Sequence, residues 1–131
     1  MKYLIDTDWV VDYLKGRAPA TALMESLAQE DAAISIITYG EIYEGIHFGR
    51  ERAQHERGFR GFLQIVGVLT LDQFIMEQFA QIRGDLRAQG QIIGDLDLLI
   101  AATALTHDLA VATLDEKHFA RIPRLGVVVP R

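Results

Sequence analysis

Along the chain, short apolar runs alternate with longer segments in which apolar residues recur every three or four positions. The short runs are rich in Val, Ile, Leu and Ala, which is typical of buried strands. Strands are therefore predicted at Lys2–Asp6, Ala32–Ile37, Val66–Leu71, Leu109–Thr113 and Gly126–Val129. The longer segments have the periodicity of helices that bury one face. Helices are predicted from Thr7 or Asp8 to Lys15, and over Pro19–Gln29, Thr38–Phe48, Glu51–Gln64, Asp72–Gln89, Asp95–His107 and Glu116–Arg121.

This alternation of strands and helices predicts the fold class. Parallel strands need a crossover connection, usually a helix, so the repetition indicates a mainly parallel sheet with helices on both faces. The chain of 131 residues can bury its own core, and no repeat or linker divides it. We therefore expect residues 1–131 to form a single α/β domain. In such sheets, ligands bind beyond the carboxyl ends of the strands.

Composition narrows the chemistry that this domain can use. A hydrophobic fraction of 50% and a charged fraction of 24% are those of a folded globular protein. The apolar stretch Met1–Ile5 is too short for a signal peptide and no later run approaches a membrane span, so we expect a cytoplasmic protein without a membrane partner. The sequence has no cysteine, which excludes thiolate zinc sites, disulfides and a cysteine nucleophile. Any bound metal should be a hard ion with oxygen ligands.

The net charge of −5 and the pI near 5.3 argue against a passive nucleic-acid binder, which normally presents a basic face. If this protein acts on nucleic acid, the attraction has to be local. An acidic cluster loaded with divalent cations, with basic residues around its rim, would provide it.

Four carboxylates stand where a predicted strand passes into a helix or where a helix begins: Asp6, Glu41, Asp97 and Asp115. Each alone has a structural explanation, because Asp6 and Asp115 are suited to cap helices and Glu41 can form a capping box with Thr38. Asp97 lies one turn inside a nearly apolar helix for which Asp95 is the better N-cap. Parallel topology would bring all four to one sheet edge. There they would repel one another unless a cation lay among them, so together they predict a divalent metal site.

These acids belong to four ordered motifs that extend over nearly the whole chain. Residues 6–8 read DTD after the first strand, and residues 38–45 read TYGEIYEG, of the form Thr-x-x-Glu-(x)₃-Gly. Residues 97–104 read DLLIAATA, close to Asp-x-x-Ile-Ala-Ala-x-Ala, and residues 113–115 read TLD, followed by Phe119. In this order the motifs resemble those of the PIN-domain family, specifically of VapC-type toxin ribonucleases.

The resemblance implies a three-layer α/β/α sandwich with a central, mainly parallel, short-stranded sheet. It also implies an endoribonuclease that uses Mg²⁺ or Mn²⁺ to hydrolyse RNA phosphodiester bonds, leaving 5′-phosphate and 3′-hydroxyl ends, as the toxin of a toxin–antitoxin pair. Asp6, Glu41 and Asp97 would be the core metal acids and Asp115 a fourth, with Thr7 and Thr113 supporting the cofactor site. Asp95 is an extra acid beside Asp97, although the helical face favours Asp97. The implied partners are RNA, a cognate antitoxin and a second copy in a homodimer.

Other polar residues have simpler interpretations. The histidines at 47, 55, 107 and 118 lack metal-binding spacing and are expected at the surface or at helix ends, and Trp9 is expected in the core. The pairs Arg83/Arg87 and Arg57/Arg60 are expected on solvated helix faces, although either could attract phosphate.

Two other function classes fit the acids less well. A haloacid-dehalogenase-like phosphatase would use the Asp6-Thr7-Asp8 motif but needs a mid-chain lysine that this sequence lacks. A receiver-type signalling domain needs a late lysine after a strand, and Lys117 lies in the wrong context. A non-catalytic interaction module is the third alternative, which divalent-dependent RNA cleavage would exclude.

Overall fold

The structure, a computed structural model, describes residues 2–29 and 31–129, and within them strands and helices alternate as the sequence predicts. The first part of the chain forms β1 (Tyr3–Ile5), α1 (Thr7–Leu14), α2 (Ala18–Gln29), β2 (Ala32–Ser35), α3 (Ile36–Phe48) and α4 (Arg52–Phe62). The second part forms β3 (Gly67–Leu69), α5 (Gln73–Ala88), α6 (Asp95–Thr106), β4 (Ala110–Ala112), α7 (Glu116–Ala120) and β5 (Val127–Val128).

The five strands form one parallel sheet in the order β3-β2-β1-β4-β5. Strand β1 is central, and its Leu4 is paired with Ala33 of β2 and Val111 of β4. Because β1, β2 and β4 run in one direction, their carboxyl ends meet at the same edge of the sheet. The predicted α/β class with a mainly parallel, short-stranded sheet is confirmed.

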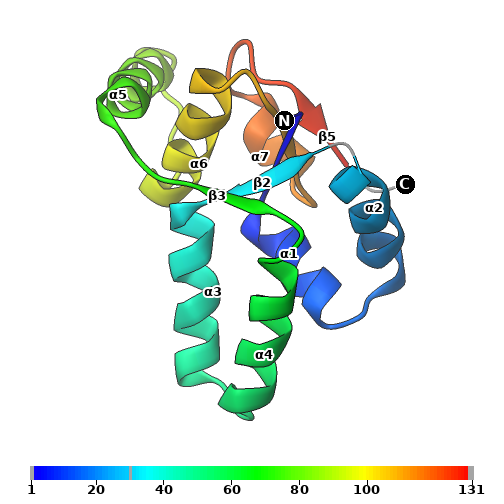
Figure 1. The fold of residues 1–131 in the computed structure, drawn as a ribbon. Coiled ribbons are helices and arrows are strands. Elements are labelled where there is room, and N and C mark those ends of the chain that lie inside the picture. Colours follow the sequence, from blue (N-terminus) through cyan, green and yellow to red (C-terminus); the bar gives the residue numbers. More distant parts are fainter. Residues whose placement is uncertain (1, 30, 130–131) are drawn as a thin grey trace.

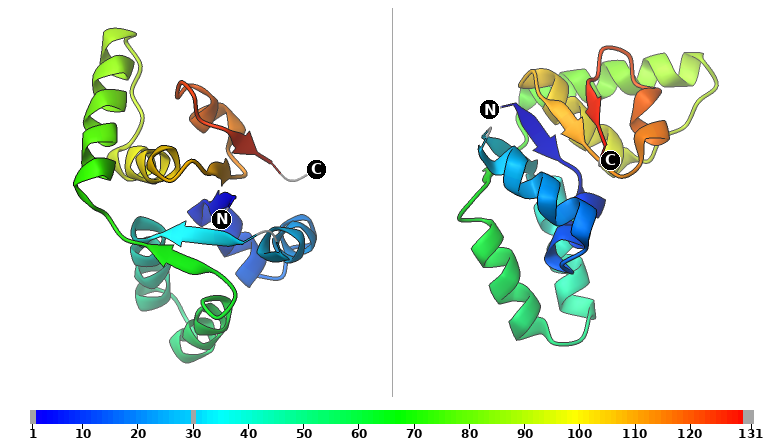
Figure 2. Two further views of the ribbon diagram at one scale, coloured as in Figure 1. Left: turned by 45° about the horizontal axis from the view of Figure 1, so that its top comes forward. Right: turned by 90° about the vertical axis from the view of Figure 1, so that its right-hand side faces the viewer.

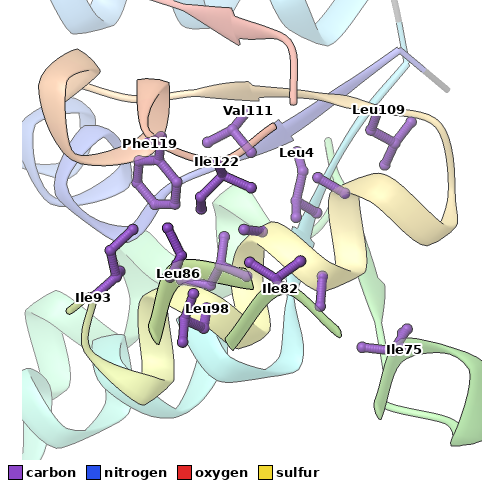
Figure 3. Close-up of a cluster of buried hydrophobic side chains, with 14 of the residues drawn as sticks. Leu4, Ile75, Ile82, Leu86, Ile93, Leu98, Leu109, Val111, Phe119 and Ile122 are labelled. Carbon is purple, nitrogen blue, oxygen red and sulfur yellow. The ribbon is translucent and has the colours of Figure 1, made fainter. Parts of the chain in front are cut away.

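Helices cover both faces of the sheet, which gives the predicted three layers (Figures 1 and 2). Side chains alternate between faces along each strand. Leu4 and Val111 accordingly join the buried cluster under α5, α6 and α7, while their neighbours Ile5 and Ala112 join the cluster under α1 to α4. Figure 3 shows the first cluster gathered between the sheet and helices α5 and α6. These two cores fix the helices whose ends surround the sheet edge.

The structure identifies the N-caps of three helices, α1, α3 and α6. Helix α3 begins at Ile36, because the Ser35 hydroxyl caps it by accepting a hydrogen bond from the Ile37 amide at 3.0 Å. The strand predicted to run to Ile37 therefore ends at Ser35. Among the candidates Asp6, Thr7 and Asp8, the N-cap of α1 is Asp6, whereas the N-cap of α6 is Gly94 rather than the predicted Asp95. All three helix starts lie beside the carboxyl edge of the sheet, so the corrections bear on the site.

Among the described residues, no helix is both long enough and apolar enough to cross a membrane. Helix α6 is nearly all apolar because it is buried between α5 and the sheet. Helices α3 and α4 form a hairpin that projects away from the rest of the molecule (Figure 1). Aromatic contacts close this hairpin, with Tyr39 and Tyr43 of α3 lying 5.5 and 5.6 Å from the Phe59 ring.

Candidate active site

A pocket of about 290 Å³ lies at the carboxyl edge of the sheet, and all four predicted acids line it. Its lining residues come from four separate segments of the chain: Asp6, Thr7, Asp8, Glu41, Asp97, Asp115, His118 and Phe119. Apart from Phe119 these side chains are polar, and five of them are carboxylates. The parallel topology thus brings together acids that the sequence separates by up to 109 positions, from Asp6 to Asp115.

Asp6 is the most enclosed acid of the pocket, with 6% of its surface exposed. One carboxylate oxygen accepts a hydrogen bond from the Thr7 amide at 2.8 Å, and the other accepts from the Thr113 hydroxyl at 2.8 Å. Asp6 is thus the helix cap that its sequence position suggested, and it also lines the pocket. The capping role therefore leaves the Asp6 side chain at the pocket.

Glu41 lies in the second turn of α3 and is not part of a capping box. Because Ser35 caps the helix, Thr38 lies inside α3 and the predicted pairing of Thr38 with Glu41 at the helix start is wrong. The Glu41 carboxylate accepts a hydrogen bond from the Thr7 hydroxyl at 2.7 Å, and that hydroxyl also lies 3.0 Å from the Thr38 hydroxyl. Thr7, which follows shortly after β1, therefore holds the Glu41 carboxylate at the pocket. Glu41 does not cap its own helix.

Asp97, and not Asp95, faces the pocket. Asp95 points toward α5, where its carboxylate lies 3.6 Å from the Arg83 guanidinium, and its side chain is 61% exposed. The Arg83–Asp95 pair joins α5 to α6. Arg83 also lies 5.8 Å from the centre of the Phe79 ring on its own helix. The helical-face argument for Asp97 agrees with this arrangement.

Asp115 caps α7 and lines the pocket as well. Its carboxylate accepts from the His118 amide at 3.3 Å, while its own amide donates to the Thr113 hydroxyl at 2.9 Å. Thr113 is fully buried and lies behind the pocket, where it connects Asp6 to Asp115. Thr7 lines the pocket directly, so the two predicted supporting threonines act from different positions.

The electrostatics of the pocket are dominated by Asp6 and Asp8. Burial, and after it the nearby charge of Asp8, raise the pKa of Asp6 from its ordinary 3.8 to about 8, although hydrogen bonds from Thr113 and Thr7 act to lower it. Burial also raises the pKa of Asp8, although the hydrogen bond with Asp6 lowers it. The pair therefore holds a proton where a cation would otherwise neutralise the charge.

Two polar lining residues were missed by the sequence-based choice of site residues. Asp8 was considered only as a helix cap or as part of a motif, and His118 was expected at the surface or at a helix end. The His118 ring lines the pocket, with Nε2 at 2.8 Å from a carboxylate oxygen of Asp97. The signal in the sequence is spacing, because His118 lies three positions after Asp115 and shares its helix face.

The donor set suits a hard divalent cation. Within residues 2–29 and 31–129, no group of three or more Asp, Glu or His side chains stands in an arrangement that could hold a metal ion. Mg²⁺ ordinarily binds through one or two carboxylates and keeps several waters. An open pocket with several carboxylates and a protonated Asp6 fits such an ion, because the ion would replace the proton and reduce the repulsion.

Comparisons with known proteins agree with this geometry. The family profile described as PIN domain matches residues 3–125. The chain belongs to the PIN-domain family. Among relatives of this PIN domain, Ribonuclease VapC1 of Methanocaldococcus jannaschii is 33% identical over 128 residues, which cover 98% of this chain and 86% of that protein. The tRNA(fMet)-specific endonuclease VapC of Shigella flexneri is 25% identical over 122 residues, covering 93% of this chain and 92% of that protein.

Solved structures place this PIN domain in the VapC-type branch. A chain of VapBC2 from Rickettsia felis, crystallised with a DNA fragment from its promoter, superposes with a TM-score of 0.93 at 27% identity and covers 100% of both chains. A chain of DNA-bound VapBC from Salmonella typhimurium superposes with a TM-score of 0.91 at 26% identity, covering 98% of each. The resemblance that the four motifs indicated is confirmed.

The alternative interpretations of the acids do not fit the pocket. No lysine is among the described residues that line it, so neither the receiver-type nor the phosphatase arrangement is present there.

Trp9 is fully buried and its indole N–H donates to the Ala20 carbonyl at 3.3 Å, which confirms its predicted core role. Arg60 is paired with Glu56 at 3.1 Å on the exposed face of α4, away from the acids.

Proposed function

We propose that this protein is a divalent-metal-dependent endoribonuclease that acts in the cytoplasm as the toxin of a toxin–antitoxin pair. The observation that carries the proposal is the convergence of Asp6, Glu41, Asp97 and Asp115 in one pocket, where burial and a neighbouring carboxylate raise the pKa of Asp6 to about 8. The names of the VapC relatives support RNA cleavage as the reaction.

Each proposed residue has a defined task. Asp6, Glu41 and Asp97 would hold Mg²⁺ or Mn²⁺, and Asp115 would hold a second ion or orient a water. When bound, such an ion neutralises charge on the phosphoryl oxygens and lowers the pKa of a bound water. Thr7 and Thr113 fix the Glu41 and Asp6 carboxylates through hydrogen bonds of 2.7 and 2.8 Å. No side chain is proposed as a covalent nucleophile.

The acidic pocket also explains how a protein of net charge −5 can take a polyanion. Carboxylates alone repel RNA phosphate, and only after cation binding does the pocket attract it. Both RNA binding and RNA cleavage should therefore require the divalent cation. A passive basic surface would give binding in chelator.

The activity test uses a matched pair of substitutions on one helix. Asp97→Asn and Asp95→Asn make the same charge change two positions apart, but only Asp97 lines the pocket. We expect Asp97→Asn to abolish divalent-dependent cleavage of an RNA substrate and Asp95→Asn to retain it, with unchanged circular dichroism in both. Glu41→Gln should also abolish cleavage, because an amide is a poor Mg²⁺ ligand. Cleavage at the wild-type level by all three variants would refute the proposal.

For the antitoxin, we propose a segment lying in the groove between α1, α3 and α4. This groove of about 670 Å³ is lined by apolar residues such as Leu14, Ile42 and Ile46. Glu41 lines both the groove and the acidic pocket, so a segment lying in one can extend a side chain into the other. An arginine or lysine would suit the acids by charge. Solved VapBC complexes are the structural relatives that support a protein partner.

A glycine pair tests this docking site without disturbing the core. Gly45 lines the groove, and a Cβ atom built on it meets no other atom within 4 Å, so we expect Gly45→Gln to fold and to fill the groove. Gly61→Gln is the control, because a Cβ atom built on Gly61 also meets no other atom within 4 Å and Gly61 does not line the groove. Coexpressed with the protein encoded beside it, Gly61→Gln should form the complex and Gly45→Gln should not.

We also propose that the protein forms a homodimer, as the family resemblance implies. Light scattering tests this, and a monomer in solution would contradict it.

A further inference from the structure

The His118 side chain lines the pocket, but the proposed metal chemistry does not use it. Its ring lies at the mouth of the site with its side chain 25% exposed, and its edge packs on Phe119 at 5.7 Å between ring centres. The Nε2 atom is buried and lies 2.8 Å from a carboxylate oxygen of Asp97, but the two are not aligned as a closed hydrogen bond. A buried N–H without an aligned acceptor is unfavourable. The position of Nε2 beside Asp97 therefore needs an explanation.

The other ring nitrogen determines where the imidazole proton lies. The Arg121 guanidinium lies 3.1 Å from Nδ1 of His118. A guanidinium can only donate hydrogen bonds, so Nδ1 has to accept and carries no proton. The N–H is thereby placed on Nε2, the nitrogen that faces Asp97. This arrangement is unsuited to metal ligation by Nε2, because a metal requires the lone pair there.

We propose that His118 is a positioning residue for Asp97, with Arg121 fixing the tautomer that makes Nε2 the donor. The protonated Nε2 lies 2.8 Å from one oxygen of the Asp97 carboxylate and leaves the other oxygen for the cation. Partners of this kind orient a ligating side chain and so raise the affinity of the site. The inference rests on the proposed function, because it takes Asp97 to be a metal ligand.

Metal affinity is the appropriate measurement, because it reports on Asp97 without requiring RNA turnover. Loss of such a partner typically weakens metal binding by about tenfold to a hundredfold. We expect His118→Ala to weaken Mn²⁺ binding by about tenfold in calorimetry. His118→Gln should restore most of it, because the Gln amide N–H can replace Nε2–H. His107→Ala, at the exposed far end of α6, is the control and should bind Mn²⁺ as the wild type does.

A double-mutant cycle separates this inference from the proposed function. If His118 acts through Asp97, His118→Ala should cause no further loss in the Asp97→Asn background. If Asp97→Asn itself leaves Mn²⁺ binding unchanged, the proposed ligand set is wrong. Two outcomes would leave the ligand set standing but refute the role of His118. In the first, Asp97→Asn weakens Mn²⁺ binding and His118→Ala does not. In the second, His118→Ala weakens Mn²⁺ binding equally in the wild-type and Asp97→Asn backgrounds.

Nitrogen NMR provides a readout that does not depend on metal. In mildly alkaline buffer with chelator, long-range ¹H–¹⁵N spectra should show His118 with an unprotonated Nδ1 and a protonated Nε2. Arg121→Met should weaken this preference, while Arg124→Met, on the loop that follows, should not. The opposite tautomer in wild type would overturn the proposal.

Discussion

Replacing Asp6 by Asn should stabilise the metal-free protein, and the gain should grow with pH. In wild type, burial and the charge of Asp8 raise the pKa of Asp6 from 3.8 to about 8. The folded state therefore binds this proton more tightly than the unfolded chain does. The corresponding stability is fully present below about pH 4 and is lost as pH rises toward 8. Asn has no proton to lose, so its stability should not fall over this window.

The magnitude follows from linkage. A full proton difference changes the free energy of unfolding by about 1.4 kcal/mol per pH unit, and the gap between 3.8 and about 8 sets an upper limit of about 6 kcal/mol. Asp8 shares the proton, which spreads the titration over both groups. We expect Asp6→Asn to gain about 2 kcal/mol over wild type between pH 5 and pH 8, or roughly 6–10 °C in melting temperature.

The substitution preserves the hydrogen bonds around Asp6, so the comparison isolates charge. The Asn oxygen can accept from the Thr7 amide, as an N-cap Asn does, and its amide can donate to the Thr113 hydroxyl and to Asp8. Thermal melts in chelator at both pH values measure the effect. Asp85→Asn, an exposed acid on α5, is the control for loss of one charge. A difference between wild type and Asp6→Asn that stays constant with pH would refute the reasoning.

Three further predictions follow from individual contacts. Mn²⁺ binding near neutral pH should release close to one proton from wild type and less from Asp6→Asn, because the ion has to displace the proton of Asp6; calorimetry in two buffers of different ionisation enthalpy measures it. Ser35→Ala should lower the urea-unfolding free energy by about 1 kcal/mol, whereas no loss would mean that Ser35 does not stabilise α3. Trp9→Ala should cost about 3–5 kcal/mol in the same assay, since Trp9 is fully buried; a cost below 1 kcal/mol would contradict its core role.

The strands and helices could be predicted because their signals are local and strong. Short apolar runs and period-3.6 patterns identified the five strands and seven helices, and the alternation predicted the parallel sheet. The start of α3 could not be predicted in the same way. Thr38 and Glu41 match a capping box, but Ser35 caps the helix instead, and the partly buried Ile37 packs against the first core cluster from inside α3.

The acids of the site could be chosen from sequence because topology brings strand ends together. Their partners could not, because hydrogen bonds such as Thr7 to Glu41 and Thr113 to Asp6 join segments 34 and 107 residues apart. The same limit hid the contact between His118 and Asp97. It also hid where the electrostatic strain lies, which is at Asp6 and Asp8, the most crowded acids of the pocket.

The central claim is that the pocket formed by Asp6, Glu41, Asp97 and Asp115 binds a divalent cation. A crystal structure of the protein soaked with Mn²⁺, recorded with anomalous data, tests it directly. We predict an anomalous peak in this pocket within ligating distance of Asp6 and Asp97, and its loss in Asp97→Asn. A fully soaked crystal with no peak in the pocket, or with Mn²⁺ bound only elsewhere, would contradict the account.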